Sequence, residues 1–198
     1  MDRITLEVIG SGLLSIAEEM GEALIKASYS SNIKEREDCS TAVFNLRGEV
    51  IAQAEHIPMH LGSLIMIVQE TLKRYPVSEL REGDVFIGND PYTGGSTHLP
   101  DITVVSPVFH EGEPVGFVAN IAHHADGSGR ETRTIYDEGL RIRPIRVVEG
   151  CRLREDVMEL LLLNFHLPRE RRGDFRAQFA ANRIGAERRS DGVGRNQR

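Results

Sequence analysis

Two short segments of this chain carry residues that could hold a metal. Residues 97–101 (THLPD) contain His98 and Asp101, and residues 122–126 (AHHAD) contain His123, His124 and Asp126. Imidazole nitrogens and carboxylate oxygens are the ligands that divalent metals such as zinc take in proteins. A His-x-x-Asp spacing also occurs by chance, and a buried histidine at a strand end often only bonds a carbonyl group. The residues alone therefore leave a metal site and a structural hydrogen-bond network both open.

The elements around these segments predict that they meet. Two apolar runs, 102–109 and 115–122, are joined by a turn-forming stretch at 110–114 (HEGEP). A hairpin would bring the start of the first run beside the end of the second, and would gather His98, Asp101 and His123 at one end of a sheet. Side chains alternate along a strand, so His123 and His124 cannot face the same way. Spacing alone does not choose between them.

Other polar residues are weaker candidates. Asp38 lies in the dense polar segment 32–40 and is a further possible carboxylate ligand, although such a run is also typical of a solvated turn. His56 and His60 are four residues apart, but Pro58 between them argues against one helix, so we interpret them as pocket or hydrogen-bonding residues. We find no nucleophile elbow that would support covalent catalysis, and no phosphate loop that would support ATP binding.

The spacing of apolar residues along the rest of the chain predicts an α+β fold. We expect a mixed or antiparallel sheet with flanking helices and the metal site at the sheet end. A hairpin is expected across the Arg47-Gly48 turn. The expected helices are 2–27, 62–75, 155–163 and 172–188, and the other expected strands are 41–46, 49–53, 84–88 and 141–148. We expect one domain over residues 1–189 and a disordered tail over 190–198.

Composition narrows the class of protein. The chain has 198 residues, 40% of them hydrophobic, and a net charge of −6, which argues against a general nucleic-acid binder. Residues 169–198 hold nine arginines and four acidic residues, a charge of +5, which leaves −11 on the rest of the chain. We interpret this end as a solvated helix and a disordered tail, with contact to RNA or a partner surface as the alternative. Neither a membrane span nor a signal peptide is expected, which predicts a cytoplasmic protein. Cys39 and Cys151 are expected to be reduced structural thiols.

Five motifs follow one another along the chain. They are residues 31–40 (SNIKEREDCS), 51–63 (IAQAEHIPMHLGS), 84–92 (DVFIGNDPY), 97–101 (THLPD) and 122–127 (AHHADG). Together they resemble the hydantoinase B family. The resemblance runs from about residue 5 to about residue 187 and includes the segment 172–178 (RGDFRAQ) near the end. Members of the family are much longer than this chain, so the resemblance implies the N-terminal portion of a longer subunit.

The resemblance implies a function. The family includes subunits of ATP-dependent N-methylhydantoinases and 5-oxoprolinases, which open cyclic amides. A kinase-like, hydantoinase A-like partner subunit uses the ATP to phosphorylate the substrate, so ATP is not expected to bind here, and a hetero-oligomer is expected. The implied metal ligands, for zinc or manganese, are Asp38, His98, Asp101 and His123. His124 or Asp126 would shuttle protons or orient a ligand. The alternatives are a subunit of an acetone or acetophenone carboxylase and a truncated chain that only binds partner subunits.

Overall fold

The sheet is antiparallel throughout in the computed structural model, which describes residues 2–55, 57, 59–94, 96–124 and 133–195. Its seven strands follow the order β2-β1-β5-β4-β3-β6-β7, so the two longest strands lie at its centre. The strands are β1 (Cys39–Phe44), β2 (Val50–Glu55), β3 (Val85–Gly88), β4 (Asp101–His110), β5 (Glu113–His123), β6 (Ile145–Glu149) and β7 (Arg152–Leu153). The predicted α+β class is confirmed.

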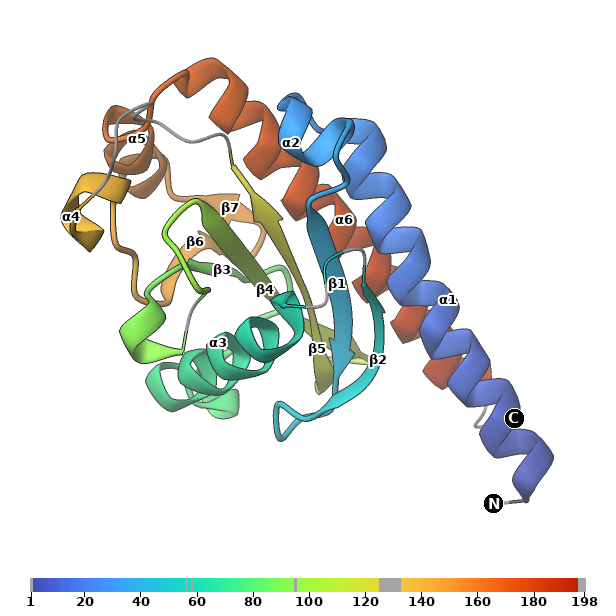
Figure 1. Ribbon diagram of the computed structural model, residues 1–198. Helices are drawn as coiled ribbons and strands as arrows, with labels where there is room; N and C mark the ends of the chain where they lie inside the picture. Colours follow the sequence, from blue (N-terminus) through green and yellow to red (C-terminus); the bar gives the residue numbers. More distant parts are fainter. Residues whose placement is uncertain (1, 56, 58, 95, 125–132, 196–198) are drawn as a thin grey trace.

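Helices cover both faces of the sheet (Figure 1). On one face lies α3, and on the other α1 and α6 run side by side. The helices are α1 (Arg3–Ala27), α2 (Ser31–Lys34), α3 (His60–Arg74), α4 (Ile135–Glu138), α5 (Glu155–Leu163) and α6 (Pro168–Arg195), with short 3-10 turns at Val77–Glu79 and Pro91–Thr93. None of the described helices is long and apolar enough to span a membrane.

The central hairpin forms as the sequence predicts. The turn between β4 and β5 has only two residues, Glu111 and Gly112, with φ values of 51° and 84°. Positive φ at both positions is the signature of a type I′ turn, whose twist matches that of paired strands. The resulting register places Asp101 directly opposite His123.

Alternation divides the residues of each central strand between two cores. In β5, Phe117, Ala119 and Ile121 join the core beneath α3. The residues between them face the other way: Val118 packs in the core with α1, and Ala122 packs with residues of α1 and α6. The last two histidines of this stretch continue the same alternation, which fixes the face that each can reach.

Several boundaries differ from the prediction. The strand expected at 141–148 begins at Ile145, because Pro144 has no N–H for a ladder and Ile142 instead exchanges two hydrogen bonds with Asn89. The two-residue strand β7 was not predicted. Helix α6 begins at Pro168, a favourable first-turn residue, and its backbone continues to Arg195. The predicted division of the chain at residue 189 stays a prediction.

The arginine-rich end is not wholly solvated, so that part of the interpretation was wrong. Arg171 and Arg189 are buried, while Arg188 pairs with Glu19 of α1. Arg189 donates to Phe44 O at 2.8 Å and to Val115 O at 3.1 Å. A buried carbonyl without a hydrogen-bond donor lowers the stability of the fold. The Arg189 guanidinium gives a donor to each of these two carbonyls.

Candidate metal centre

Three side chains converge at the end of the central hairpin. Asp101 is the first residue of β4 and His123 the last of β5, and His98 lies three residues before Asp101. His98 Nε2 and His123 Nδ1 each lie 2.8 Å from Asp101 Oδ1, and the two nitrogens are 3.2 Å apart. The three residues form a group whose ligand atoms all lie within 4.8 Å of one another. The structure thus brings together three of the four predicted ligands.

The electrostatics of the group favour an ionised carboxylate. Burial alone would raise the pKa of Asp101, but hydrogen bonds from His123 and His98 outweigh it and lower the pKa to about 2. The Asp101 side chain is 3% exposed, whereas that of His98 is 41% exposed. The group is therefore buried on its carboxylate side and open to the surface on the His98 side.

A third imidazole approaches the group from α3. His60, the first residue of that helix, is buried, with Nδ1 3.2 Å from Ser40 Oγ. Its Nε2 lies 3.6 Å from Asp38 Oδ1 and 3.8 Å from Asp101 Oδ2. Burial lowers the pKa of His60, against the opposing effect of Asp101 and Asp38, which favours a neutral ring. His60 is thus a hydrogen-bonding residue, as interpreted from the sequence.

The loop that carries His98 is fixed by buried polar side chains. Asn89 donates from Nδ2 to Leu99 O at 2.7 Å and to Leu140 O at 3.0 Å. The Ser96 hydroxyl lies 2.7 Å from both His98 O and Asp101 O. These contacts hold the ligand-bearing segment at both ends, so its side chains are positioned before any cation arrives.

The geometry fits a divalent metal. The donor set is two imidazole nitrogens and a carboxylate oxygen, which zinc and manganese both accept. With bonds of about 2.0–2.1 Å, tetrahedral ligand atoms lie about 3.3 Å apart. The two nitrogens, 3.2 Å apart, are close to this separation, whereas each lies 2.8 Å from Asp101 Oδ1 and would move outward on a cation. Three protein ligands with an accessible side are typical of a catalytic metal site, because a structural site uses all four positions.

The other predicted residues that the structure describes, Asp38 and His124, are not part of the group of three. Asp38 contacts His60. His124 points to the α6 face, where it is buried and its Nε2 lies 2.9 Å from Gln178 Oε1. Burial and the charge of Arg171 lower the pKa of His124, which favours a neutral ring. Asp126 and His56 lie outside the described residues.

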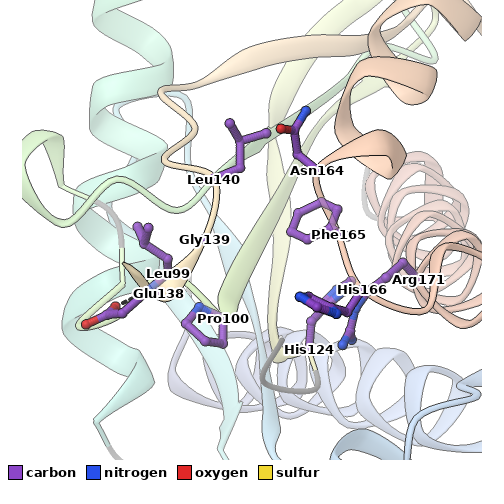
Figure 2. Close-up of a pocket in the computed structure, with 10 residues that line it drawn as sticks. All are labelled: Leu99, Pro100, His124, Glu138, Gly139, Leu140, Asn164, Phe165, His166 and Arg171. Carbon is purple, nitrogen blue, oxygen red and sulfur yellow. Dashed lines mark hydrogen bonds between the residues drawn. The ribbon is translucent and has the colours of Figure 1, made fainter. Parts of the chain in front are cut away.

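His124 also lines a small cavity behind the ligand segment (Figure 2). The cavity has a volume of about 40 Å³, and Leu99, Pro100 and Arg171 contribute to its wall. Leu99 and Pro100 face this cavity, while their neighbours His98 and Asp101 belong to the group of three. The cavity and the group of three therefore lie on opposite sides of the segment 98–101.

Sequence reasoning missed Ser40 and Gln178. The signal for Gln178 was available, because polar residues recur at helical spacing on one side of α6. They are Arg171, Asp174, Gln178 and Asn182, and all four are buried. Apolar periodicity through Phe175 and Phe179 hid this second, polar face.

Comparison with known proteins gives a family and several relatives. A family model described as hydantoinase B/oxoprolinase matches residues 2–196. 5-oxoprolinase 1 of Arabidopsis thaliana is 39% identical over 93% of this chain and 16% of its own length. The beta subunit of the Pseudomonas jessenii caprolactamase is 37% identical over 93% of this chain and 33% of its own length.

Solved structures agree with this result. The crystal structure of the ATP-dependent caprolactamase from P. jessenii superposes with a TM-score of 0.89 at 36% identity, over 98% of this chain and 34% of that chain. A nucleotide-free acetone carboxylase superposes with a TM-score of 0.87 at 20% identity, over 98% of this chain and 26% of that chain, which shows a shared fold alone. The chain spans about a third or less of these relatives. It belongs to the hydantoinase B/oxoprolinase family.

Proposed function

We propose that this chain is the metal-bearing part of an ATP-dependent cyclic-amide hydrolase. Its substrate would be a lactam, hydantoin or 5-oxoproline whose oxygen a kinase-like, hydantoinase A-type partner subunit has phosphorylated. The observation that supports this most directly is the convergence of His98, Asp101 and His123 on one point. The chain that carries this group is itself related to a 5-oxoprolinase and to a caprolactamase.

In this proposal Zn²⁺ or Mn²⁺ is held by His98, Asp101 and His123, with Asp38 as an additional carboxylate. The metal would supply Lewis acidity, which lowers the pKa of water toward neutrality and so makes hydroxide available. Asp101, ionised at neutral pH, accepts from both imidazoles through one oxygen, and the same two nitrogens would give up these hydrogen bonds to bind the cation. His60 lies between the carboxylates of Asp38 and Asp101, where a neutral ring adds no repulsion toward a cation.

The two residues proposed to assist the reaction receive different roles. The ring of His124 faces away from the metal group and is bonded to Gln178, so we assign it to orienting the strand end. Asp126 keeps the proposed role of proton shuttle. A cytoplasmic hetero-oligomer with the kinase-like subunit completes the proposal.

Ring opening is preferred over carboxylation because of the relatives. The hydrolases share 36–39% of their aligned residues with this chain, whereas the likeness to acetone carboxylase concerns the fold alone. A chain that only binds partner subunits is the remaining alternative, and metal content separates it from the proposal.

The first test measures the metal. Elemental analysis of the purified chain should find about one Zn²⁺ or Mn²⁺ per molecule, and His98→Ala should lose it while staying folded by circular dichroism. His110→Ala, at the opposite end of β4, is the matched control and should keep the metal.

The second test measures the reaction. Mixed with a hydantoinase A-type subunit, ATP and 5-oxoproline, hydantoin or caprolactam, the loaded chain should support ring opening that His98→Ala abolishes. A parent chain that neither carries nor takes up a divalent metal would contradict the proposal. Ring opening that survives in His98→Ala would also contradict it.

A further inference from the structure

One buried side chain on α6 contacts the neighbours of two proposed metal ligands at once. Gln178 is fully buried. Its Nε2 donates to Ile102 O at 2.8 Å, and its Oε1 lies 2.9 Å from His124 Nε2. Ile102 directly follows Asp101, and His124 directly follows His123.

The two contacts fix the orientation of the amide. A carbonyl oxygen can only accept, so the Gln178 NH₂ must face Ile102 O and the amide oxygen must face His124. His124 Nε2 then carries the proton that is donated to that oxygen. A flipped amide would set two oxygens against each other at Ile102, so each contact supports the other.

Gln178 is itself hydrogen-bonded to the sheet through its backbone oxygen. Asn120 of β5 donates from Nδ2 to the backbone oxygen of Gln178 at 2.9 Å and to Asn182 Oδ1 at 2.7 Å. The β4–β5 hairpin thus sets the position of Gln178, and the Gln178 side chain in turn joins the two open ends of that hairpin. Because side chains alternate, it acts on these ends from the face opposite the metal group.

We propose that Gln178 is a positioning residue of the metal centre, which sets the separation of Asp101 and His123 by tying together the residues that follow them. This inference rests on the proposed function, since it requires that the group of three binds a metal. It assigns the buried polar face of α6 a role in that site in addition to its role in packing.

Asn182 provides a matched control on the same helix. It lies one turn further along α6, is equally buried, and donates to Val104 O at 3.2 Å and to Ser106 Oγ at 3.0 Å. Both residues are therefore buried amides that bond a carbonyl of β4. The hydrogen bonds of Gln178 reach the neighbours of both proposed ligands, and those of Asn182 lie further along the strands.

The experiment compares Gln178→Ala and Asn182→Ala in the 198-residue chain. Zn²⁺ affinity is measured by competition with a chromophoric chelator, and the unfolding midpoint by thermal melting. Both variants should lower the midpoint, because each removes a buried hydrogen-bonding group. Gln178→Ala should in addition weaken Zn²⁺ binding roughly 10-fold or more, as loss of ligand-orienting contacts does, while Asn182→Ala should change it by less than about twofold. If Gln178→Ala does not fold, Gln178→Met preserves the volume and allows the same comparison.

The outcomes separate the two proposals. Tight Zn²⁺ binding by the parent with equal affinities in both variants would overturn the role of Gln178 and leave the metal site standing. An equal loss of affinity in both variants would also overturn it, because the effect would then follow stability. A parent that binds no Zn²⁺ would overturn the proposed function and this inference together.

Discussion

His123 and His124 are neighbours in sequence and occupy opposite faces of one sheet. On the α3 face, His123 shares a carboxylate oxygen with His98 at a place that opens to the surface. On the α6 face, His124 is 1% exposed, packs against Phe175 with ring centroids 4.9 Å apart, and is held by Gln178. The same side-chain type is thus proposed to bind a cation on one face and to fix the strand end on the other.

The difference shows how a strand end can support chemistry. Ligand atoms must converge on one point and must be able to give up their hydrogen bonds to one another when a cation binds. The residues that alternate with them can be fully packed, and this rigidity is what keeps the ligands in place. We expect substitutions on the two faces to separate metal binding from stability.

The largest effect is expected from the two histidines themselves. His123→Ala removes a ligand and should weaken Zn²⁺ binding at least about 100-fold, more than loss of an orienting contact costs. His124→Ala should instead lower the free energy of unfolding by about 2–3 kcal/mol, because it removes a buried ring and leaves Gln178 Oε1 without its donor. Its Zn²⁺ affinity should fall by about 10-fold, because His124→Ala removes one of the two contacts of Gln178. Chelator competition and urea denaturation measure the two quantities, and a reversed pattern would invalidate the contrast.

A smaller effect is expected in the reactivity of the two cysteine thiols, which lie in differently packed parts of the molecule. Cys39 lies on the packed face with Leu24 and Ala122, and Cys151 is exposed. Burial, followed by the charges of Asp38 and Glu37, raises the pKa of Cys39 to about 12, so its reactive thiolate is scarce at pH 8. Ellman's reagent should modify one thiol per folded chain and two after unfolding. Two equally fast thiols in the folded protein would show that this face is not closed.

The smallest effect is expected where α1 extends beyond the sheet. A Cβ added at Gly10 would meet nothing within 4 Å, so Gly10→Ala should raise the free energy of unfolding by about 0.5–1 kcal/mol through helix propensity alone. Gly185→Ala is the contrasting variant, because its Cβ would collide with Met20 Sδ in the α1–α6 contact, and it should be destabilising. Urea denaturation of both measures the difference, and a destabilising Gly10→Ala would reveal a contact at this end of the helix.

The sequence predicts the hairpin and the convergence of His98, Asp101 and His123 better than it predicts what surrounds them. Apolar runs on either side of a Glu-Gly turn are local signals, and they were enough to place Asp101 beside His123. The approach of His60 depends on how α3 packs over the sheet, which no local pattern records. Gln178 was obscured for a different reason, since polar residues on a helix are normally assigned to solvent, whereas here they bond sheet carbonyls and His124. Strand β6 began late because Asn89 uses the backbone of Ile142.

The two-residue turn at Glu111-Gly112 has a consequence for tolerated insertions and deletions. It lies at the far end of strands of ten and eleven residues, about 30 Å from the ligands at a rise of about 3.3 Å per residue. A single residue gained or lost there would let β5 slip by one position and exchange the faces of its side chains. His124 would then turn toward Asp101, and His123 toward α6. The chemistry at one end of the molecule is therefore sensitive to the length of a loop that touches none of its ligands.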